Sequence, residues 1–561
     1  MKLTRRTLLK WGIIVGGATL LPGGRRIARA DDLPPSPPTR SFFVELKEGT
    51  DGGLPPIASG EEGADIPPVP GGFPTQADPA DCVNVDGTTA FHVHGPRVVP
   101  SNTEFFLIHE KPVPHSFHPD LPLNVLWGYN GTIPGPTFVA RSGTPQLIRF
   151  VNDLPTNDPV RIGEPITAIH RHGGFQAPED DGYPLDTFCS GQSRDYFYPN
   201  RPDAGNPQNE HSTNWYHDHA IDITAENVYR GLAGFFLYHN DFDTGDEATG
   251  LRLPSNKFNG EKIGPFDIPL VIQDRLFDRN GFLVYNSFDH DGFIGDKFLV
   301  NGKIQPFLKV ARRKYRFRVL NGSSARVYQF FLSSGQPFIA IGTDSHLLER
   351  PVTVQSFRLA PAERVEVIID FANAKSGDEI FLVNRLKQTD GRKPDGLVSP
   401  GTPILKFVVG SELGANIQVP DTLLPVTEGP QQLLPRVKVQ RTFEFERSDG
   451  AWVINGQFFD ENRINAKPRR GEPEIWILKS GGGWVHPVHI HLSEFFILSR
   501  DGKAPPPLER GRKDTILIGG DVGREVKLLI KFEEFSGRYV FHCHNIEHED
   551  MRMMAQFEVQ P

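Results

Sequence analysis

Histidine is concentrated at four places in this sequence of 561 residues. Ten of its 19 histidines fall into four short clusters, two of which lie before residue 220 and two after residue 485. Imidazole and thiolate together form a ligand set that suits copper or zinc. The clusters therefore indicate metal chemistry, and they read His170-Arg171-His172, His217-Asp218-His219, His486 with His489 and His491, and His542-Cys543-His544 with His548.

The spacing within these clusters has a meaning if they lie on β-strands. Side chains two residues apart share one face of a strand, so we expect each His-x-His pair to aim two imidazoles at one point. In His542-Cys543-His544 the two imidazoles would face one way and the thiol the other. One strand would then serve two metal sites, and the backbone of Cys543 would join them as a path for electrons.

Two features favour copper over zinc. Cys543 with His486 and His548 forms a His₂Cys set, and Met553 follows five residues after His548 as a weak axial ligand, which is the composition of a blue-copper site. Structural zinc usually takes more cysteine, and catalytic zinc needs only three protein ligands. The remaining imidazoles suffice for three more ions, so the sequence predicts four copper ions per chain.

Other histidines carry weaker signals. Phe91-His92-Val93-His94 has the spacing of a ligand pair but no second cluster at a matching distance, and it is predicted to be structural. His115 and His118 lie in a Pro-rich stretch and are predicted to be solvated.

An internal repeat organises the rest of the chain. Asn130-Gly131, Asn301-Gly302 and Asn455-Gly456 are each followed, about 20 residues later, by an alternating apolar segment typical of a β-strand. The copies lie about one domain length apart. Because Gly (56) and Pro (50) are abundant and helical periodicity is scarce, we predict an all-β protein of three Greek-key β-sandwich domains.

This pattern predicts the following division of the chain. The predicted segments are a Pro/Gly-rich N-terminal arm over 31–84, domains over 85–250 and 251–418, a linker over 419–435 and a third domain over 436–561.

Residues 1–30 have the pattern of an export signal of the twin-arginine type. Arg5-Arg6 precedes a short apolar stretch, and Ala28-Arg29-Ala30 provides a small-residue cleavage site. We therefore expect a periplasmic or secreted protein, the alternative being a basic tail before a short core helix. In that compartment Cys82 and Cys189 can form a disulfide, although two free thiols remain the alternative.

Charge and hydropathy exclude some classes of protein. The formal charge is −9, which disfavours a nucleic-acid partner because phosphates require a basic surface. No apolar run approaches the ~20 residues of a membrane span, so no integral membrane segment is expected. A monomer is expected.

Several motifs of the chain resemble the multicopper oxidases, in particular the branch of bacterial spore-coat laccases and bilirubin oxidases. The resemblance covers roughly residues 120–561 and implies three cupredoxin-like domains. The motifs that carry it are Trp215-Tyr216-His217-Asp218-His219-Ala220, His542-Cys543-His544-Asn545-Ile546-Glu547-His548-Glu549-Asp550, His172-Gly173-Gly174 and Asp181-Gly182-Tyr183-Pro184.

The resemblance also implies a role for each ligand, with a trinuclear cluster between the first and third domains. It implies a type 1 copper at His486, Cys543 and His548 with Met553 axial (Met551 and Met554 are the rivals), a type 2 copper at His170 and His489, and a type 3 pair at His172, His217, His219, His491, His542 and His544.

The activity implied is one-electron oxidation of a small-molecule reductant at the type 1 copper, coupled to four-electron reduction of O₂ to water at the cluster. Electrons would enter at the exposed edge of His548 or His486. Asp181 and Glu549 would supply protons as general acids.

The reductant is less defined by the sequence. Oxidases of cuprous ion carry Met-rich segments, and this chain has only four methionines. We therefore expect a laccase-like oxidase of phenols, aromatic amines or tetrapyrroles. The alternatives are a metallo-oxidase of Mn(II) or Fe(II), and a non-catalytic copper-binding envelope protein; a two-domain copper nitrite reductase is disfavoured.

Overall fold

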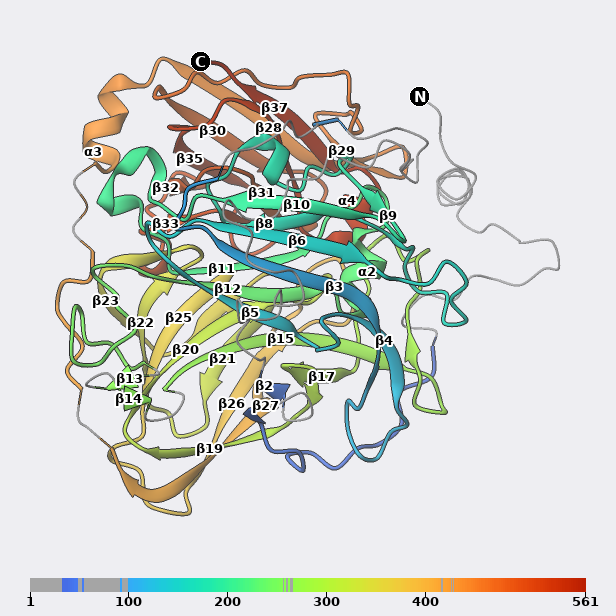
Figure 1. Ribbon diagram of the computed structural model, residues 1–561, viewed down its shortest axis with the longest axis vertical. Helices are drawn as coiled ribbons and strands as arrows, with labels where there is room; N and C mark the ends of the chain where they lie inside the picture. The colour runs from blue at the N-terminus through green and yellow to red at the C-terminus, as the bar shows by residue number, and fades with distance from the viewer. Residues whose placement is uncertain are drawn as a thin grey trace.

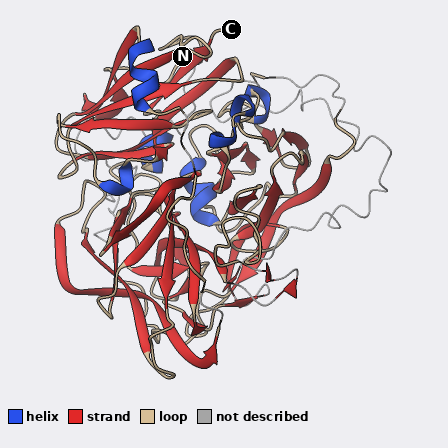
Figure 2. Ribbon diagram, turned by 90° about the vertical axis from the view of Figure 1, so that its left-hand side faces the viewer, coloured by secondary structure: helices blue, strands red, loops and turns tan. Residues whose placement is uncertain are grey.

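The computed structural model describes residues 33–48, 53–54, 91–92, 99–255, 257–258, 261–262, 266–414, 417–424, 426 and 428–561. In this part of the chain strands dominate and helices are short (Figure 2). Three pairs of sheets follow one another along the sequence, and the third pair lies at the top of Figure 1. The predicted signal at 1–30, His94, Cys82 and most of the predicted arm lie outside the described residues.

The first sandwich pairs the sheet β10-β6-β3-β4 with the sheet β5-β12-β11-β8. Phe106 on one sheet and Phe138 and Phe236 on the other belong to one buried core, so the two sheets face each other. The strands are β3 (Glu104–His115), β4 (Asn124–Tyr129), β5 (Gly135–Arg141), β6 (Gln146–Asn152), β8 (Ile169–His172), β10 (Ser193–Tyr198), β11 (Thr213–Asp218) and β12 (Ala233–His239). A small two-stranded sheet, β7 (Ile166–Thr167) with β9 (Phe188–Cys189), adjoins them.

The second sandwich pairs the sheet β18-β17-β15-β20-β25-β22-β23 with the sheet β19-β27-β26-β21-β24, and β16 pairs with β15. Phe317 and Phe407 come from opposite sheets of its core. The strands are β15 (Asp267–Phe277), β16 (Leu283–Val284), β17 (Lys297–Val300), β18 (Lys303–Ile304), β19 (Phe307–Arg312), β20 (Lys314–Asn321), β21 (Tyr328–Leu332), β22 (Phe338–Thr343), β23 (His346–Val354), β24 (Phe357–Leu359), β25 (Arg364–Asp370), β26 (Glu379–Lys387) and β27 (Gly396–Leu413).

The third sandwich pairs the sheet β29-β28-β30-β35-β32-β33 with the sheet β34-β31-β36-β37. Trp476 and Phe541 come from opposite sheets of its core. The short helix α3 (Pro430–Leu433) precedes it. The strands are β28 (Val439–Ser448), β29 (Ala451–Ile454), β30 (Pro473–Ser480), β31 (Val485–Ile490), β32 (Phe495–Arg500), β33 (Arg512–Lys513), β34 (Thr515–Gly519), β35 (Glu525–Lys531), β36 (Gly537–Cys543) and β37 (Met554–Val559).

One strand order recurs in all three sandwiches. The first strand of each pairs in parallel with the alternating strand that begins about 13 to 18 residues after the Asn-Gly turn: β3 with β6, β15 with β20 and β28 with β30. In between, the chain crosses to the second sheet, as in a Greek key. It does so through β5 and β19 and, in the third sandwich, through isolated bridges from Ala466 and Arg469. The prediction of an all-β chain of three Greek-key sandwiches is confirmed, whereas the residue limits of the domains stay predictions.

The Asn-Gly repeat forms the same turn three times. Asn130 (φ 49°) and Gly131 (φ 73°) both have positive φ, as a type I′ turn requires, and the other two copies match. Each Asn side chain also accepts a backbone N–H from the first strand of its sandwich. These bonds run from His109 to Asn130 (2.7 Å), from Val271 to Asn301 (2.8 Å) and from Glu444 to Asn455 (2.7 Å).

Two short helices connect the first and third sandwiches. Helix α2 (Thr224–Arg230) packs against α4 (Ile546–Asp550), and the two lie side by side in Figure 1. Ala225 N donates to Asp550 Oδ2 at 3.1 Å, and Arg552 pairs with Asp222 at 2.8 Å. These contacts dock the two sandwiches that contain the histidine clusters.

The prediction that His115 and His118 are solvated is wrong. His115 is 5% exposed and its Nε2 lies 2.8 Å from the carbonyl oxygen of Gly302, while His118 is fully buried against the backbone of Arg40. The covering segments are 187 and 78 residues away, so local composition could not reveal them. His92 pairs with Asp186 at 2.7 Å, which agrees with a structural role.

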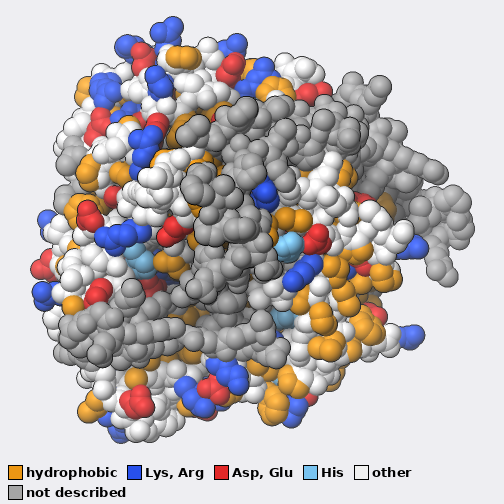
Figure 3. All heavy atoms as spheres, in the orientation of Figure 1, with side chains coloured by type: hydrophobic (Ala, Val, Ile, Leu, Met, Phe, Trp, Pro, Cys, Tyr) orange, Lys and Arg blue, Asp and Glu red, His pale blue; other side chains and the backbone are white. Residues whose placement is uncertain are grey.

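On the face shown in Figure 3, the coloured Lys and Arg side chains are interspersed with Asp and Glu. Among the described residues, no helix combines the length and the apolar character that a membrane crossing requires.

Candidate metal centre

All ten cluster histidines and Cys543 converge from the first and third sandwiches. Each of these side chains is at most 1% exposed. Four strands position them, namely β8, β11, β31 and β36, and α4 adds His548. His219, His491 and His544 each come directly after the last residue of their strand. Donor atoms within 4.8 Å of one another form these groups: His486, Cys543 and His548; His172, His217 and His544; His219, His491 and His542; and His170, His172 and His489.

The Cys543 group lies on the opposite face of β36 from His542 and His544. Cys543 Sγ is 3.5 Å from Nδ1 of both His486 and His548. Strand alternation causes this division, since neighbouring residues of a strand point to opposite faces.

Methionines border the same group. Met551 and Met553 belong to the buried core cluster that contains Cys543, whereas Met554 packs in a different one. The backbone of Met553 also accepts the N–H of Cys543.

The remaining eight imidazoles form two triads and a pair. Nε2 of His542 is 3.1 Å from Nε2 of His219 and 3.3 Å from that of His491. The pair is His170 and His489, whose Nε2 atoms lie 3.4 Å apart. Antiparallel registers bring them together, because His170 pairs with His217 across β8 and β11 and His489 with His542 across β31 and β36.

One expectation about spacing needs correction. The two imidazoles of a His-x-His pair do not aim at one point: the His217–His219 and His542–His544 pairs each divide between the two triads. A strand rises about 3.3 Å per residue, so residues two apart are offset along it. The observed ring separations are 5.7 Å for His217–His219 and 5.4 Å for His542–His544, so each pair serves neighbouring positions.

Two predicted carboxylates hold the outer nitrogens of the imidazoles. Asp181 Oδ2 lies 2.7 Å from His491 Nδ1, and its backbone oxygen lies 2.5 Å from His170 Nδ1. Glu549 lies 3.0 Å from His542 Nδ1 and 3.3 Å from His219 Nδ1. The triad of His219, His491 and His542 therefore rests on these two side chains.

The two carboxyl groups differ in acidity. Burial raises the pKa of Asp181 to about 8. Burial also favours the protonated form of Glu549, but the neighbouring His542 and His219 outweigh it and hold the pKa of Glu549 below its usual value.

A third carboxylate was not predicted from the sequence. Asp514 Oδ1 lies 3.0 Å from His172 Nε2, and the backbone oxygen of Asp514 lies 2.9 Å from His489 Nδ1. Its neighbours Lys513 and Thr515 form no recognisable motif with it. Asp514 could be identified only from the structure, in which it lies between β33 and β34, beside β31.

The donors fit copper. Burial lowers the pKa of His486 to about 3 and of His172 to about 4, so these imidazoles are neutral and able to bind a metal near pH 7. Burial raises the pKa of the Cys543 thiol, so a thiolate there requires a bound cation. His172 Nδ1, His217 Nε2 and both ring nitrogens of His544 are buried without a hydrogen-bond partner in the described part of the chain.

The expectation that His548 or His486 has an exposed edge is wrong. Both are fully buried, and Trp452 stacks on His548 with ring centroids 3.8 Å apart. Trp484 packs edge-on against Trp452 at 4.6 Å and is itself 6% exposed. The sequence around His548 does not reveal that its ring is covered, because Trp452 lies on β29, almost 100 residues earlier.

Two exposed cations lie over these indoles. The guanidinium of Arg392 is 4.8 Å from the ring of Trp484, and that of Arg447 is 5.2 Å from the ring of Trp452. Arg447 also pairs with Asp291 at 3.1 Å. Basic side chains thus cover the indole that stacks on His548 and the indole beside it.

Comparisons with known proteins agree with this geometry. Multicopper oxidase family profiles match residues 116–242, 272–398 and 432–561. The chain is 34% identical to a bilirubin oxidase of Albifimbria verrucaria over 476 residues, which cover 81% of this chain and 76% of the relative. It is also 34% identical to a laccase of Bacillus subtilis over 505 residues, which cover 79% of this chain and 92% of the relative.

Solved structures show the same architecture. The laccase of Pediococcus acidilactici Pa5930 superposes with a TM-score of 0.69 at 26% identity and covers 93% of this chain and all of its own. The three sandwiches are therefore cupredoxin-like, as predicted.

Proposed function

Because this chain belongs to the multicopper oxidase family, a family of copper oxidoreductases that use O₂, we propose that it is a laccase-like oxidase of organic reductants with four copper ions per chain. The observation that carries the proposal is the arrangement on β36. Its Cys543 belongs to one donor group, and the flanking His542 and His544 belong to the two triads.

We assign the ligands as follows. His486, Cys543 and His548 would hold the type 1 copper with Met553 as a weaker fourth ligand, His170 and His489 the type 2 copper, and His172, His217, His544, His219, His491 and His542 the type 3 pair. When bound, copper would accept electrons singly at the first site and deliver four of them to O₂, which becomes two waters.

Protons for water formation require acids beside the triads. Asp181 and Glu549 contact outer ring nitrogens there and are buried from bulk solvent. We assign both the role of holding and transferring protons, Asp181 beside His491 and Glu549 between His219 and His542.

The surface over the type 1 site supports an organic reductant with an acidic substituent. Arg392 and Arg447, which lie over the buried indoles of Trp484 and Trp452, would offer cations to such a substituent. Similarity to a laccase and a bilirubin oxidase supports the same class of donors, namely phenols, aromatic amines and tetrapyrroles.

Steady-state rates on a small panel test the reductant. We expect kcat/KM for a phenol and for bilirubin to exceed the values for Mn(II), Fe(II) and Cu(I), with O₂ consumed in each productive reaction. A higher kcat/KM for Mn(II) or Fe(II) would identify a metallo-oxidase, and no turnover of any donor by copper-loaded protein would identify a copper-binding protein without activity.

We further propose that the protein is exported, on the strength of Arg5-Arg6 and the following apolar stretch. Replacing Arg5 and Arg6 together by lysine should leave the protein in the cytoplasm, measured by cell fractionation. Export of that variant at the wild-type level would contradict the assignment.

A further inference from the structure

The second sandwich supplies neither Cys543 nor any of the ten clustered histidines, yet one of its arginines contacts a carboxylate beside them. We propose that Arg364, the first residue of β25, is a positioning residue: it holds Asp514 against His172 and locks the first and third sandwiches together around the cluster. This inference rests on the proposed function, because it assigns His172 to copper.

Arg364 and Asp514 form a buried bidentate pair. Nη1 of Arg364 donates to Asp514 Oδ1 at 2.7 Å, and Nη2 donates to Oδ2 at 2.6 Å. Arg364 is fully buried and Asp514 is 1% exposed. A paired fork of this kind defines the plane of the carboxylate as well as its position.

The carboxylate in turn defines the orientation of His172. Asp514 Oδ1 lies 3.0 Å from His172 Nε2, and a carboxylate paired with arginine can only accept hydrogen bonds. His172 Nε2 therefore carries the proton, which leaves Nδ1 with a free lone pair. Nδ1 is buried without a hydrogen-bond partner in the described residues and belongs to a side chain of the His217 and His544 triad.

The same guanidinium contacts all three sandwiches. Besides Asp514 of the third, Arg364 donates from Nε to the backbone oxygen of Thr213 at 3.2 Å, on the strand β11 that carries His217. Its Nη2 also donates to Ser345 of the second sandwich at 2.8 Å. Loss of Arg364 would thus release His172 and loosen the docking of β11.

The residue after His172 is suited to this arrangement. Gly173 has φ +84°, and a Cβ there would lie 2.6 Å from Arg364 Nη2 and 2.7 Å from Asp514 Oδ2. Only glycine leaves room for the pair at this backbone conformation. The position of Arg364 therefore explains why glycine follows His172 in the His172-Gly173-Gly174 motif.

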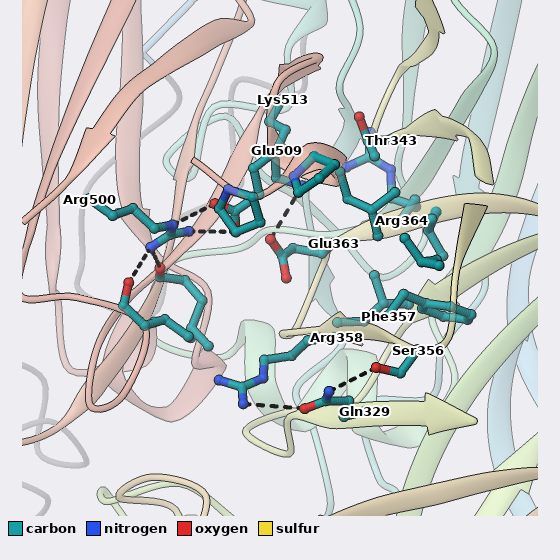
Figure 4. Close-up of a pocket in the computed structure, with 18 of the residues that line it drawn as sticks. Gln329, Thr343, Ser356, Phe357, Arg358, Glu363, Arg364, Arg500, Glu509 and Lys513 are labelled. Carbon is teal, nitrogen blue, oxygen red and sulfur yellow. Dashed lines mark hydrogen bonds and ion pairs between the residues drawn. The ribbon is translucent and has the colours of Figure 1, made fainter. Parts of the chain in front are cut away.

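Arg364 also lines a cavity of about 460 Å³ between the second and third sandwiches. Figure 4 shows it beside Glu363 and Thr343, with the Arg500–Glu509 pair on the far wall. Because this space already borders the side chain, replacing Arg364 enlarges an existing cavity instead of opening a new one in a packed core, and the variant is expected to fold.

The test is copper content of the purified holoprotein. For Arg364→Met we expect the blue type 1 absorption to persist while copper affinity at the cluster falls about 10- to 100-fold, the usual effect of losing a partner of a ligand. Copper per chain should decrease, with the loss at the type 3 pair to which His172 is assigned. Arg364→Lys keeps the positive charge but cannot form the bidentate pair, so its copper content should lie between those of wild type and Arg364→Met.

A matched control is Arg326→Met, which removes another buried arginine–aspartate pair of the second sandwich, to Asp274 at 2.7 Å. This control should lower stability but keep wild-type copper per folded chain. If Arg364→Met does not fold, Asp514→Asn serves instead, since it keeps the size and one acceptor oxygen, and it should also lower cluster copper.

Two results are distinguishable. Full copper per chain in Arg364→Met, or in Asp514→Asn where that variant is the one measured, would overturn the positioning role and leave the proposed function intact. A wild-type protein that binds fewer than four copper ions would overturn the proposed function itself.

Discussion

At the scale of single residues, the chemistry depends on burial. Each of the ten clustered imidazoles is buried, and His170, His489 and His491 each place one ring nitrogen against a protein oxygen, which leaves the other to face a metal. Carboxylates or carbonyl oxygens at the outer nitrogen define the ring orientation before any ion binds. The site is thus preorganised by its own hydrogen bonds.

Cys543→Ser should abolish both the blue colour and the oxidase activity. A serine hydroxyl cannot replace the soft thiolate in a His₂Cys site, although it occupies nearly the same volume. Visible absorption, O₂ consumption and copper analysis measure the result, and copper at the other three positions should remain. Retained blue absorption or full activity would contradict the assignment of Cys543.

Asp181→Asn should lower turnover by roughly 10²-fold or more, because a positioned general acid contributes about that factor. The amide has the same shape and can still accept the bond from His491, so copper content should stay at the wild-type level. Turnover equal to wild type would remove Asp181 from proton delivery. Loss of copper instead would show that its role is to support His491.

At the scale of strands and turns, the same Asn-Gly turn occurs in each of the three sandwiches. The Asn-Gly turn reverses the chain, and the Asn side chain bonds to the opening strand of the same sandwich, so register and turn are specified together. Correct register matters because a shift of one residue would turn Cys543 towards the triads and the imidazoles away from them.

Asn301→Ala should destabilise the protein by about 2–4 kcal/mol. The variant loses bonds to Val271 N (2.8 Å) and Pro269 O (3.0 Å), and alanine tolerates a φ of 48° less well than asparagine does. Chemical denaturation measures the loss. Asn280→Ala, in an exposed turn, is the control and should change stability by less than about 0.5 kcal/mol; equal effects in the two variants would refute the structural role of Asn301.

At the scale of the whole molecule, the cluster is an interface. Its ligands come from the first and third sandwiches, and Arg364 of the second contacts both. Bound copper and interdomain docking should therefore stabilise each other, since an ion held by two domains must be released before they separate.

Removal of copper by a chelator should lower the thermal unfolding temperature. Free copper at about 100 times its Kd would stabilise the folded state by roughly 2.7 kcal/mol per site, and that contribution disappears in the stripped protein. Calorimetry of holo, stripped and copper-restored protein measures the shift. Identical unfolding temperatures in all three samples would show that copper and docking are not linked.

Much of this molecule is determined by local sequence. The residue types and spacing by themselves identify the ten histidines and Cys543 as metal donors. Strand alternation places the thiol and the imidazoles of β36 on opposite faces, and backbone sterics select the three Asn-Gly turns. Both effects act over a few residues. The family, the all-β class and the three sandwiches could be predicted for this reason.

Tertiary structure alone decided the remainder. The grouping of the imidazoles into triads, the cover of His548 by Trp452 and the pairing of Arg364 with Asp514 all join residues that are distant in the sequence. Such contacts arise only when a sandwich folds or two sandwiches dock. The energy of burying a ring or an ion pair depends on the surface it meets and not on its neighbours in the chain.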